Sequence, residues 1–167
     1  NTGTYLDSPF HRYADGADLA GLALSDVADL PLVLVDVTGA RGRAVTAETL
    51  APYEVAGRAV LLRTGWDRHW GTEAYLSAEA PYLDEAGARM LAEAGAALVG
   101  IDGLNIDDTS GDERPAHSIL LAAGIPVLEH LTGLDRLPLA GARLHAAPPR
   151  VHGFGTFPVR AYAVIGD

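Results

Sequence analysis

The sequence predicts an α/β fold in which at least part of the sheet is parallel. Apolar, β-rich segments alternate with segments of helical periodicity along the 167 residues, and strands joined by helices usually pair in parallel. No low-complexity linker or repeat divides the chain, and its length is close to the ~150 residues typical of one domain. We therefore expect one α/β domain with a mixed sheet over residues 1–167.

Five segments are predicted as strands. Four are apolar and β-rich, as expected for strands that are covered on both faces, and the last alternates only weakly. In chain order they are 32–37, 58–63, 97–102, 125–131 and 159–165.

Three segments are predicted as helices, namely 46–53, 84–95 and 115–124. Thr46 and Asp84 are suitable N-caps for the first two. Pro115 fits the first turn of the third, because that turn needs no proline N–H.

The chain contains no cysteine and no lysine, so its twelve basic residues are all arginine. Without cysteine there is no disulfide, thiolate nucleophile or sulfur-ligated metal. Without lysine there is no Schiff base and no Walker-type phosphate loop. Any catalytic or metal chemistry must therefore come from His, Asp, Glu, Ser, Thr or Tyr.

The formal net charge of -10 argues against nucleic acid or an anionic membrane as a partner, since both attract clustered positive charge. No apolar segment approaches the ~20 residues of a membrane span, and the N-terminus lacks the features of a signal peptide. We expect a cytoplasmic protein that acts on a small molecule.

The opening segment 1–11 carries several polar side chains that could form a site. Asp7 and His11 would lie ~13 Å apart in a fully extended chain at ~3.3 Å per residue. One site can use both only if the chain turns between them, and Ser8-Pro9 is a suitable turn pair. The alternative is a polar loop in which Asp7 caps backbone amides.

Glu129 and His117 are further candidates. Glu129 interrupts a predicted apolar strand, where a buried carboxylate is costly unless it is paired or binds a metal. In an edge strand it could instead face water. His130 would point to the opposite face. His117, near a helix start, could equally be an ordinary hydrogen-bonding residue.

Two tryptophans, Trp66 and Trp70, flank a charged turn that follows Arg63. An aromatic pair suits a planar substrate through stacking, so we expect these three residues to form a pocket wall. The alternative is one core tryptophan and one surface tryptophan.

The opening segment N-T-G-T-Y-L-D-S-P-F-H resembles the signature H-x-G-T-H-x-D-x-P-x-H of the metal-dependent cyclase and kynurenine formamidase family. Four later segments resemble the same family in the same order. They are L-R-T-G-W with W-G (62–71), V-G-I-D (99–102), P-A-H with I-L-L (115–121) and G-I-P-V-L-E (124–129).

The resemblance implies a swivelling β/β/α fold and assembly as a homodimer or homotetramer. It also implies metal-dependent hydrolysis of an amide, formamide, lactam or lactone, N-formylkynurenine and isatin being substrates within the family. Family members carry a segment before the signature, so an N-terminal portion is expected to be missing here.

The resemblance transfers to the site only in part. In the family, two signature histidines and the aspartate bind one ion, and the aspartate, a later histidine and a glutamate bind a second. Asp7, His117 and Glu129 match the second set, whereas Asn1 and Tyr5 replace the two histidines of the first. The last signature histidine, which transfers protons, corresponds to His11.

These correspondences predict a single divalent ion, Zn²⁺ or Mn²⁺, bound by Asp7, His117 and Glu129 with water completing its coordination. His11 would be the general acid/base, and Tyr5 would hydrogen-bond the substrate or the water. A second ion is not expected. Two alternatives stay open at this point: a related enzyme that cyclises or dehydrates its substrate, and a metal-free binding protein on the same fold.

Overall fold

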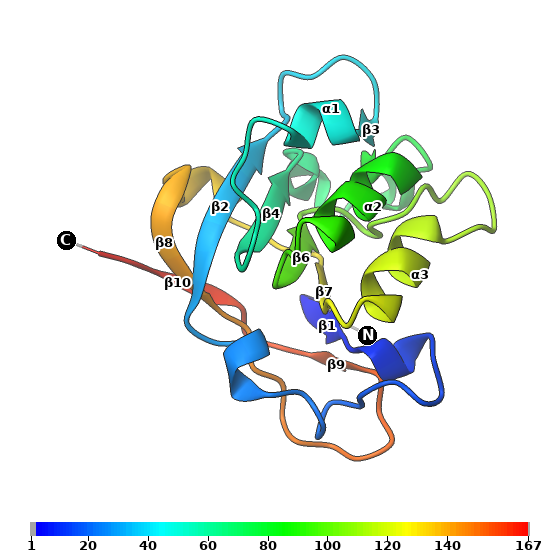
Figure 1. Cartoon of the computed structure of the whole chain (residues 1–167). Helices are drawn as coiled ribbons and strands as arrows, with labels where there is room; N and C mark the ends of the chain where they lie inside the picture. The colour runs from blue at the N-terminus through cyan, green and yellow to red at the C-terminus, as the bar shows by residue number, and fades with distance from the viewer. Residues whose placement is uncertain (1–2, 167) are drawn as a thin grey trace.

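The computed structural model of the chain describes residues 3–166. It contains one eight-stranded mixed sheet and one two-stranded sheet (Figure 1). The large sheet has the strand order β10-β8-β2-β4-β6-β7-β1-β9. In that order the strands are Tyr162–Ile165, Ala140–His145, Leu30–Asp36, Ala59–Arg63, Leu98–Ile101, Val127–Glu129, Tyr5–Asp7 and Thr156–Pro158.

The centre of the large sheet is parallel and both of its edges are antiparallel. Strands β2, β4, β6 and β7 pair in parallel, while β8 and β10 on one side and β1 and β9 on the other run antiparallel to their neighbours. The small sheet pairs β3 (Ala44–Val45) with β5 (Tyr82–Leu83). The predicted mixed α/β fold is thereby confirmed.

Three α-helices cover one face of the sheet: α1 (Ala47–Leu50), α2 (Glu85–Glu93) and α3 (Pro115–Ala122) (Figure 1). Thr46 and Asp84 cap α1 and α2 as expected, each accepting a backbone N–H. The predicted helix 46–53 is too long. Pro52 has no N–H to donate to the carbonyl four residues earlier, so α1 cannot extend through it.

The apolar central strands supply two cores. Val33 and Val35 of β2 pack into the core beneath the helices, whereas Leu32 and Leu34 face a second core on the other side. Alternate side chains of a strand point to opposite faces, so a strand covered on both sides has no polar position.

Two predicted strands are shorter than expected. The segment 125–131 contains β7 only over Val127–Glu129, because Pro126 lacks a ladder N–H and His130 adopts a left-handed φ of 58°. The segment 159–165 contains β10 over Tyr162–Ile165. Strand β7 lies between β6 and β1, so Glu129 does not lie on an edge strand.

Strands β1, β8 and β9 have no counterpart in the sequence prediction. Strand β1 is held between β7 and β9, and the turn at Ser8-Pro9 leads into a short 3₁₀ helix, η1 (Pro9–His11). This turn is the one that the opening segment predicts.

Gly155 packs directly against the backbone of η1. A Cβ atom at this position would lie 2.3 Å from the amide nitrogen of His11 and 2.8 Å from the carbonyl carbon of Phe10. The Gly155 carbonyl also accepts the Ser8 N–H at 2.7 Å. Only glycine permits this approach of the C-terminal segment to the opening turn.

Within residues 3–166, no helix is long and apolar enough to cross a membrane. The longest, α2, has nine residues.

We predict that Gly155→Ala destabilises the protein by about 1–3 kcal/mol, the usual cost of forcing a methyl group into packed structure. Its contacts are backbone atoms, which cannot move aside as a side-chain end can. Urea unfolding measures the loss. Gly39→Ala is the control, since a Cβ there meets nothing within 4 Å. Equal free energies of unfolding for the two variants would contradict the role of Gly155.

Candidate metal centre

Two neighbouring strands place Tyr5, Asp7 and Glu129 together. In the antiparallel pair of β1 and β7, Tyr5 lies directly opposite Glu129. Asp7 lies two residues further along β1, so its side chain shares the face of Tyr5. Asp7 and Glu129 are each 1% exposed, and two buried carboxylates this close together need compensating positive charge.

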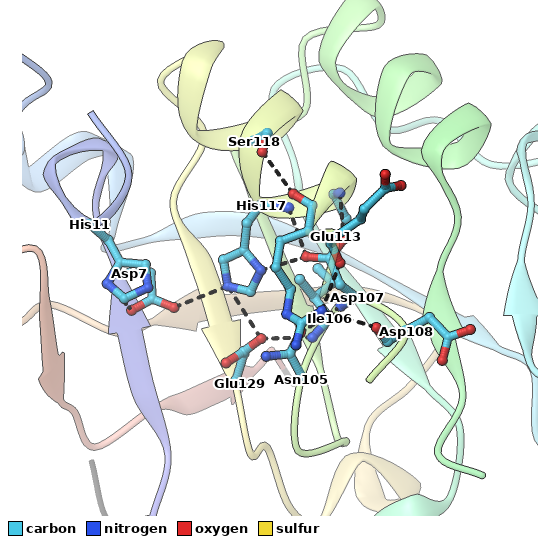
Figure 2. Close-up of polar contacts among 12 residues, drawn as sticks. Asp7, His11, Asn105, Ile106, Asp107, Asp108, Glu113, His117, Ser118 and Glu129 are labelled. Carbon is cyan, nitrogen blue, oxygen red and sulfur yellow. Dashed lines mark hydrogen bonds and ion pairs between the residues drawn. The ribbon is translucent and has the colours of Figure 1, made fainter. Parts of the chain in front are cut away.

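His117 supplies the third group, from the first turn of α3. Its Nε2 lies 3.4 Å from Oδ2 of Asp7 and 3.5 Å from Oε1 of Glu129. Figure 2 shows its ring between these two carboxylates. The three residues assigned as metal ligands by resemblance are therefore neighbours in space.

His11 lies on the open side of this cluster. Its Nδ1 is 3.8 Å from Oδ1 of Asp7, and its side chain is 41% exposed. One nitrogen of His11, one nitrogen of His117 and one oxygen of Asp7 lie within 4.8 Å of one another. These three groups could also hold a metal ion, so the geometry permits His11 as a ligand in place of Glu129.

Asp107, which the sequence prediction missed, orients His117. One of its oxygens lies 2.6 Å from Nδ1 of His117, and its carboxylate also accepts the backbone N–H groups of Ala116 and His117. Asp107 thus caps α3 and fixes which ring nitrogen faces the centre. The sequence feature that could have predicted this role is the position of Asp107, a carboxylate next to the apolar Ile106 and shortly before a predicted helix.

Two donors hold Glu129. The backbone N–H of Ile106 donates to Oε1 at 2.7 Å, and the Tyr5 hydroxyl donates to Oε2. Burial and the Glu129 carboxylate raise the pKa of Tyr5 above its usual value, so the phenol stays protonated and keeps donating. Within the described residues, the Tyr5 hydroxyl therefore acts as a hydrogen-bond donor to Glu129.

The charges of the cluster depend strongly on one another. Burial opposes a charge on His117, but its contacts with Asp107 and Asp7 outweigh burial and raise its pKa to about 10. Burial, together with the nearby Asp7, raises the pKa of Glu129 to about 7. Strongly shifted pKa values in neighbouring buried groups are typical of functional sites.

Asp7 is the member of the cluster whose hydrogen bonding is unsatisfied. Within residues 3–166, neither of its carboxylate oxygens has a hydrogen-bond partner. It therefore caps no backbone amide there, which the polar-loop alternative requires. A buried carboxylate without a hydrogen bond, with its two oxygens facing the imidazoles of His11 and His117 beside a second carboxylate, fits a divalent cation.

The remaining predicted residues lie elsewhere. Asn1 is outside the described residues. Arg63 pairs with Asp36, with 2.6 Å between Nη1 and Oδ2, and does not line the cavity at the cluster. Trp66 donates its indole N–H to the Tyr75 carbonyl at 3.1 Å.

Trp70 lines a separate, mainly apolar cavity of about 520 Å³ together with Tyr75 and His130. The Tyr75 hydroxyl lies 2.9 Å from Nδ1 of His130. The Tyr5 ring stands between this aromatic cavity and the acidic cluster, with its centroid 5.2 Å from that of His130 and its hydroxyl on Glu129.

The acidic cluster itself borders a cavity of about 130 Å³. Besides Tyr5 and the residues of the cluster, this cavity is lined by Arg12, Asn105 and Arg114. The sequence prediction missed these three, because nothing in their spacing distinguishes them from surface residues.

Comparison with known proteins gives a consistent result. The profile of the Cyclase family, described as "Putative cyclase", matches residues 1–108. The chain is 32% identical over 166 residues to the kynurenine formamidase of Salinibacter ruber (strain DSM 13855 / M31), covering 96% of this chain and 74% of that protein.

Solved structures agree with the fold. An isatin hydrolase bound to the product analogue thioisatinate has a TM-score of 0.88 at 26% identity, covering 99% of this chain and 72% of that one. A potential metal-dependent hydrolase with cyclase activity has a TM-score of 0.82 at 30% identity, covering 96% and 76%.

The profile matches most of the chain, and the similarity to the formamidase extends over nearly all of it. This chain therefore belongs to the cyclase family.

Proposed function

We propose that this chain is a metal-dependent hydrolase of a non-peptide amide, formamide, lactam or lactone. The observation that carries the proposal is Asp7, which is buried without a hydrogen bond to either oxygen in the described chain and faces His117, whose Nε2 also lies beside Glu129. Relatives named kynurenine formamidase and isatin hydrolase support this reaction class.

Asp7, His117 and Glu129 would hold one divalent ion, Zn²⁺ or Mn²⁺. The imidazole suits both metals and the two carboxylates balance the charge of the ion. When bound, such an ion supplies Lewis acidity, which polarises a carbonyl and lowers the pKa of water. Since Tyr5 donates to Glu129 and is a poor transition-metal ligand, we propose one ion per chain.

The protein groups then have distinct tasks. Asp107 holds His117 by its Nδ1 at 2.6 Å, which keeps Nε2 directed at the centre. Tyr5 and the Ile106 N–H fix the Glu129 carboxylate.

His11 is the proton-transfer group of the proposal. Half-exposed beside Asp7, it can exchange protons with solvent and protonate the leaving nitrogen or oxygen. Water adds to the carbonyl carbon, the C–N or C–O bond breaks, and the acyl part leaves as a carboxylic acid.

Three further expectations remain predictions: a substrate part that stacks on Trp70, from the aromatic pair in the sequence; assembly as a homodimer or homotetramer, from the resemblance; and a cytoplasmic location, from the composition. Sedimentation analysis measures the number of chains in the assembly. Cyclisation remains the alternative reaction, and turnover of formanilides and lactones with Zn²⁺ or Mn²⁺ separates it from hydrolysis.

We predict one divalent ion per chain in protein purified without chelator, as measured by elemental analysis. Asp7→Asn removes a charged ligand and should weaken affinity by at least the roughly 10–100-fold typical of losing an outer-shell partner. Asp26→Asn is the control, since its carboxylate is not part of the cluster and accepts from the Ser25 hydroxyl in an exposed hydrogen bond. Two tightly bound ions per chain would contradict the single-ion centre. The absence of any bound ion would contradict the metal centre itself.

We predict that His11→Gln and Glu129→Gln fail differently. His11→Gln should keep the ion but lose about 10²–10⁴-fold in kcat, the usual contribution of a general acid/base. Glu129→Gln should lose the ion as well as activity. Metal titration alongside turnover distinguishes them. If His11→Gln loses the ion and Glu129→Gln keeps it, His11 is the third ligand.

We predict that Trp70→Leu raises KM for an aromatic formamide roughly 2–10-fold, as expected from losing an aromatic contact of about 0.5–1.5 kcal/mol. Tyr162→Leu is the matched control, an aromatic residue 54% exposed on β10, at the far edge of the sheet from β1 and β9. Unchanged KM in Trp70→Leu would remove this residue from the substrate site.

A further inference from the structure

Two arginines border the cavity at the acidic cluster, and the proposed mechanism uses neither. Arg12 follows η1, directly after His11, and Arg114 precedes α3, three residues before His117. They therefore reach the same cavity of about 130 Å³ from two segments that lie far apart in the sequence.

The backbone holds Arg114 in place through one of its nitrogens. Its Nη1 donates to the carbonyls of Asp108, Gly111 and Glu113 at 3.3, 2.8 and 2.7 Å. Within residues 3–166, no hydrogen bond or ion pair is formed by its Nε or Nη2. Three N–H groups of a fixed, planar guanidinium thus remain available.

Arg12 has an exposed side chain whose guanidinium has no hydrogen-bond or ion-pair partner in the described part of the chain. Within the described residues, five arginines pair with a carboxylate: Arg43, Arg58, Arg63, Arg89 and Arg143. Arg12 and Arg114 are among the arginines that form no such pair, and what distinguishes these two is that both line the cavity at the acidic cluster.

The charge balance of the cavity points to an anion. His117 is paired with Asp107, and the other two carboxylates of the site, Asp7 and Glu129, are offset by the guanidinium groups of Arg12 and Arg114. A divalent cation bound by the carboxylates would leave the cavity with net positive charge, in a protein whose formal net charge is -10. An anionic substrate restores the balance and is drawn to this position by the local field.

We propose that Arg12 and Arg114 bind a carboxylate of the substrate, so that the preferred substrates are N-acyl or lactam compounds with a carboxylate near the scissile bond. This inference rests on the hydrolase function proposed above. A carboxylate is the favoured anion because its two oxygens match the planar fork of Nε and Nη2 on Arg114. Arg12, at the exposed rim, meets the same group from the opposite segment.

The test compares 2-formamidobenzoate with its methyl ester, which keeps the formamide and removes the charge. In the metal-loaded wild type, we expect kcat/KM for the acid to exceed that for the ester by at least tenfold. In Arg114→Gln and Arg12→Gln this ratio should fall towards one, mainly through a higher KM for the acid. Arg136→Gln is the control, because Arg136 is an exposed arginine that does not line the cavity. This variant should leave the ratio unchanged.

A uniform loss of kcat for acid and ester, with the ratio preserved, would overturn the proposal, because the arginines would then act on the reacting carbonyl. Arg114→Lys keeps the positive charge but lacks the planar guanidinium. Its acid-to-ester ratio should lie between those of Arg114→Gln and the wild type. Thermal melting of each variant establishes that it folds, and Arg12→Gln, at an exposed position, tests the proposal even if changing Arg114 disturbs the loop.

Calorimetric binding of benzoate and of inorganic phosphate to the protein, with and without the divalent ion, provides a readout that needs no turnover. Benzoate should bind more tightly than phosphate, and its affinity should fall with added salt and in both glutamine variants. If no formamide is hydrolysed but benzoate binding depends on both arginines, the hydrolase function fails and the anion site stands. If acid and ester react equally and the variants bind benzoate as the wild type does, the anion site fails and the hydrolase stands.

Discussion

The burial of two carboxylates and an imidazole in one small volume is the constraint on which the rest of this structure depends. Ionised groups removed from water are tolerated only when each is held by a partner. Glu129 is held by Tyr5 and by a backbone amide, and His117 is held by Asp107. Asp7 has no hydrogen-bond partner within the described chain, so the position beside it is where a cation is most stabilising. The pairing of β1 with β7 and the position of α3 keep these partners next to one another.

Tyr5 stands where the resemblance places a histidine of the family signature, and it gives β1 a different chemistry. A histidine there would bring a metal ligand, whereas the phenol of Tyr5 brings a hydrogen-bond donor whose raised pKa keeps it neutral. Its ring also separates the acidic cluster from the aromatic cavity around His130. Tyr5 therefore contributes both to the electrostatics of the cluster and to the wall between the two cavities.

Much of the parallel centre of the fold could be predicted from the sequence, because β2, β4 and β6 are apolar on both faces and α2 has a recognisable cap in Asp84. Strand β1 could not, since three residues are too few to show alternation and its pairing is with residues more than a hundred positions away. Asp7, His117 and Glu129 were candidates from the residues alone, the resemblance assigned them as one ligand set, and their proximity fits that assignment. Asp107, Arg12 and Arg114 escaped notice because their roles depend on which backbone and charges surround them, which spacing along the chain does not report.

The close contact of Gly155 with His11 affects when the cluster can form during synthesis. Strand β1 is made before the strands with which it pairs, Val127–Glu129 and Thr156–Pro158, and its following turn is closed by the Gly155 backbone. As the chain leaves the ribosome, Asp7 therefore stays solvated until the residues up to Pro158 have emerged. A nascent chain that lacks Thr156–Pro158 cannot complete the burial of Asp7 seen in the structure.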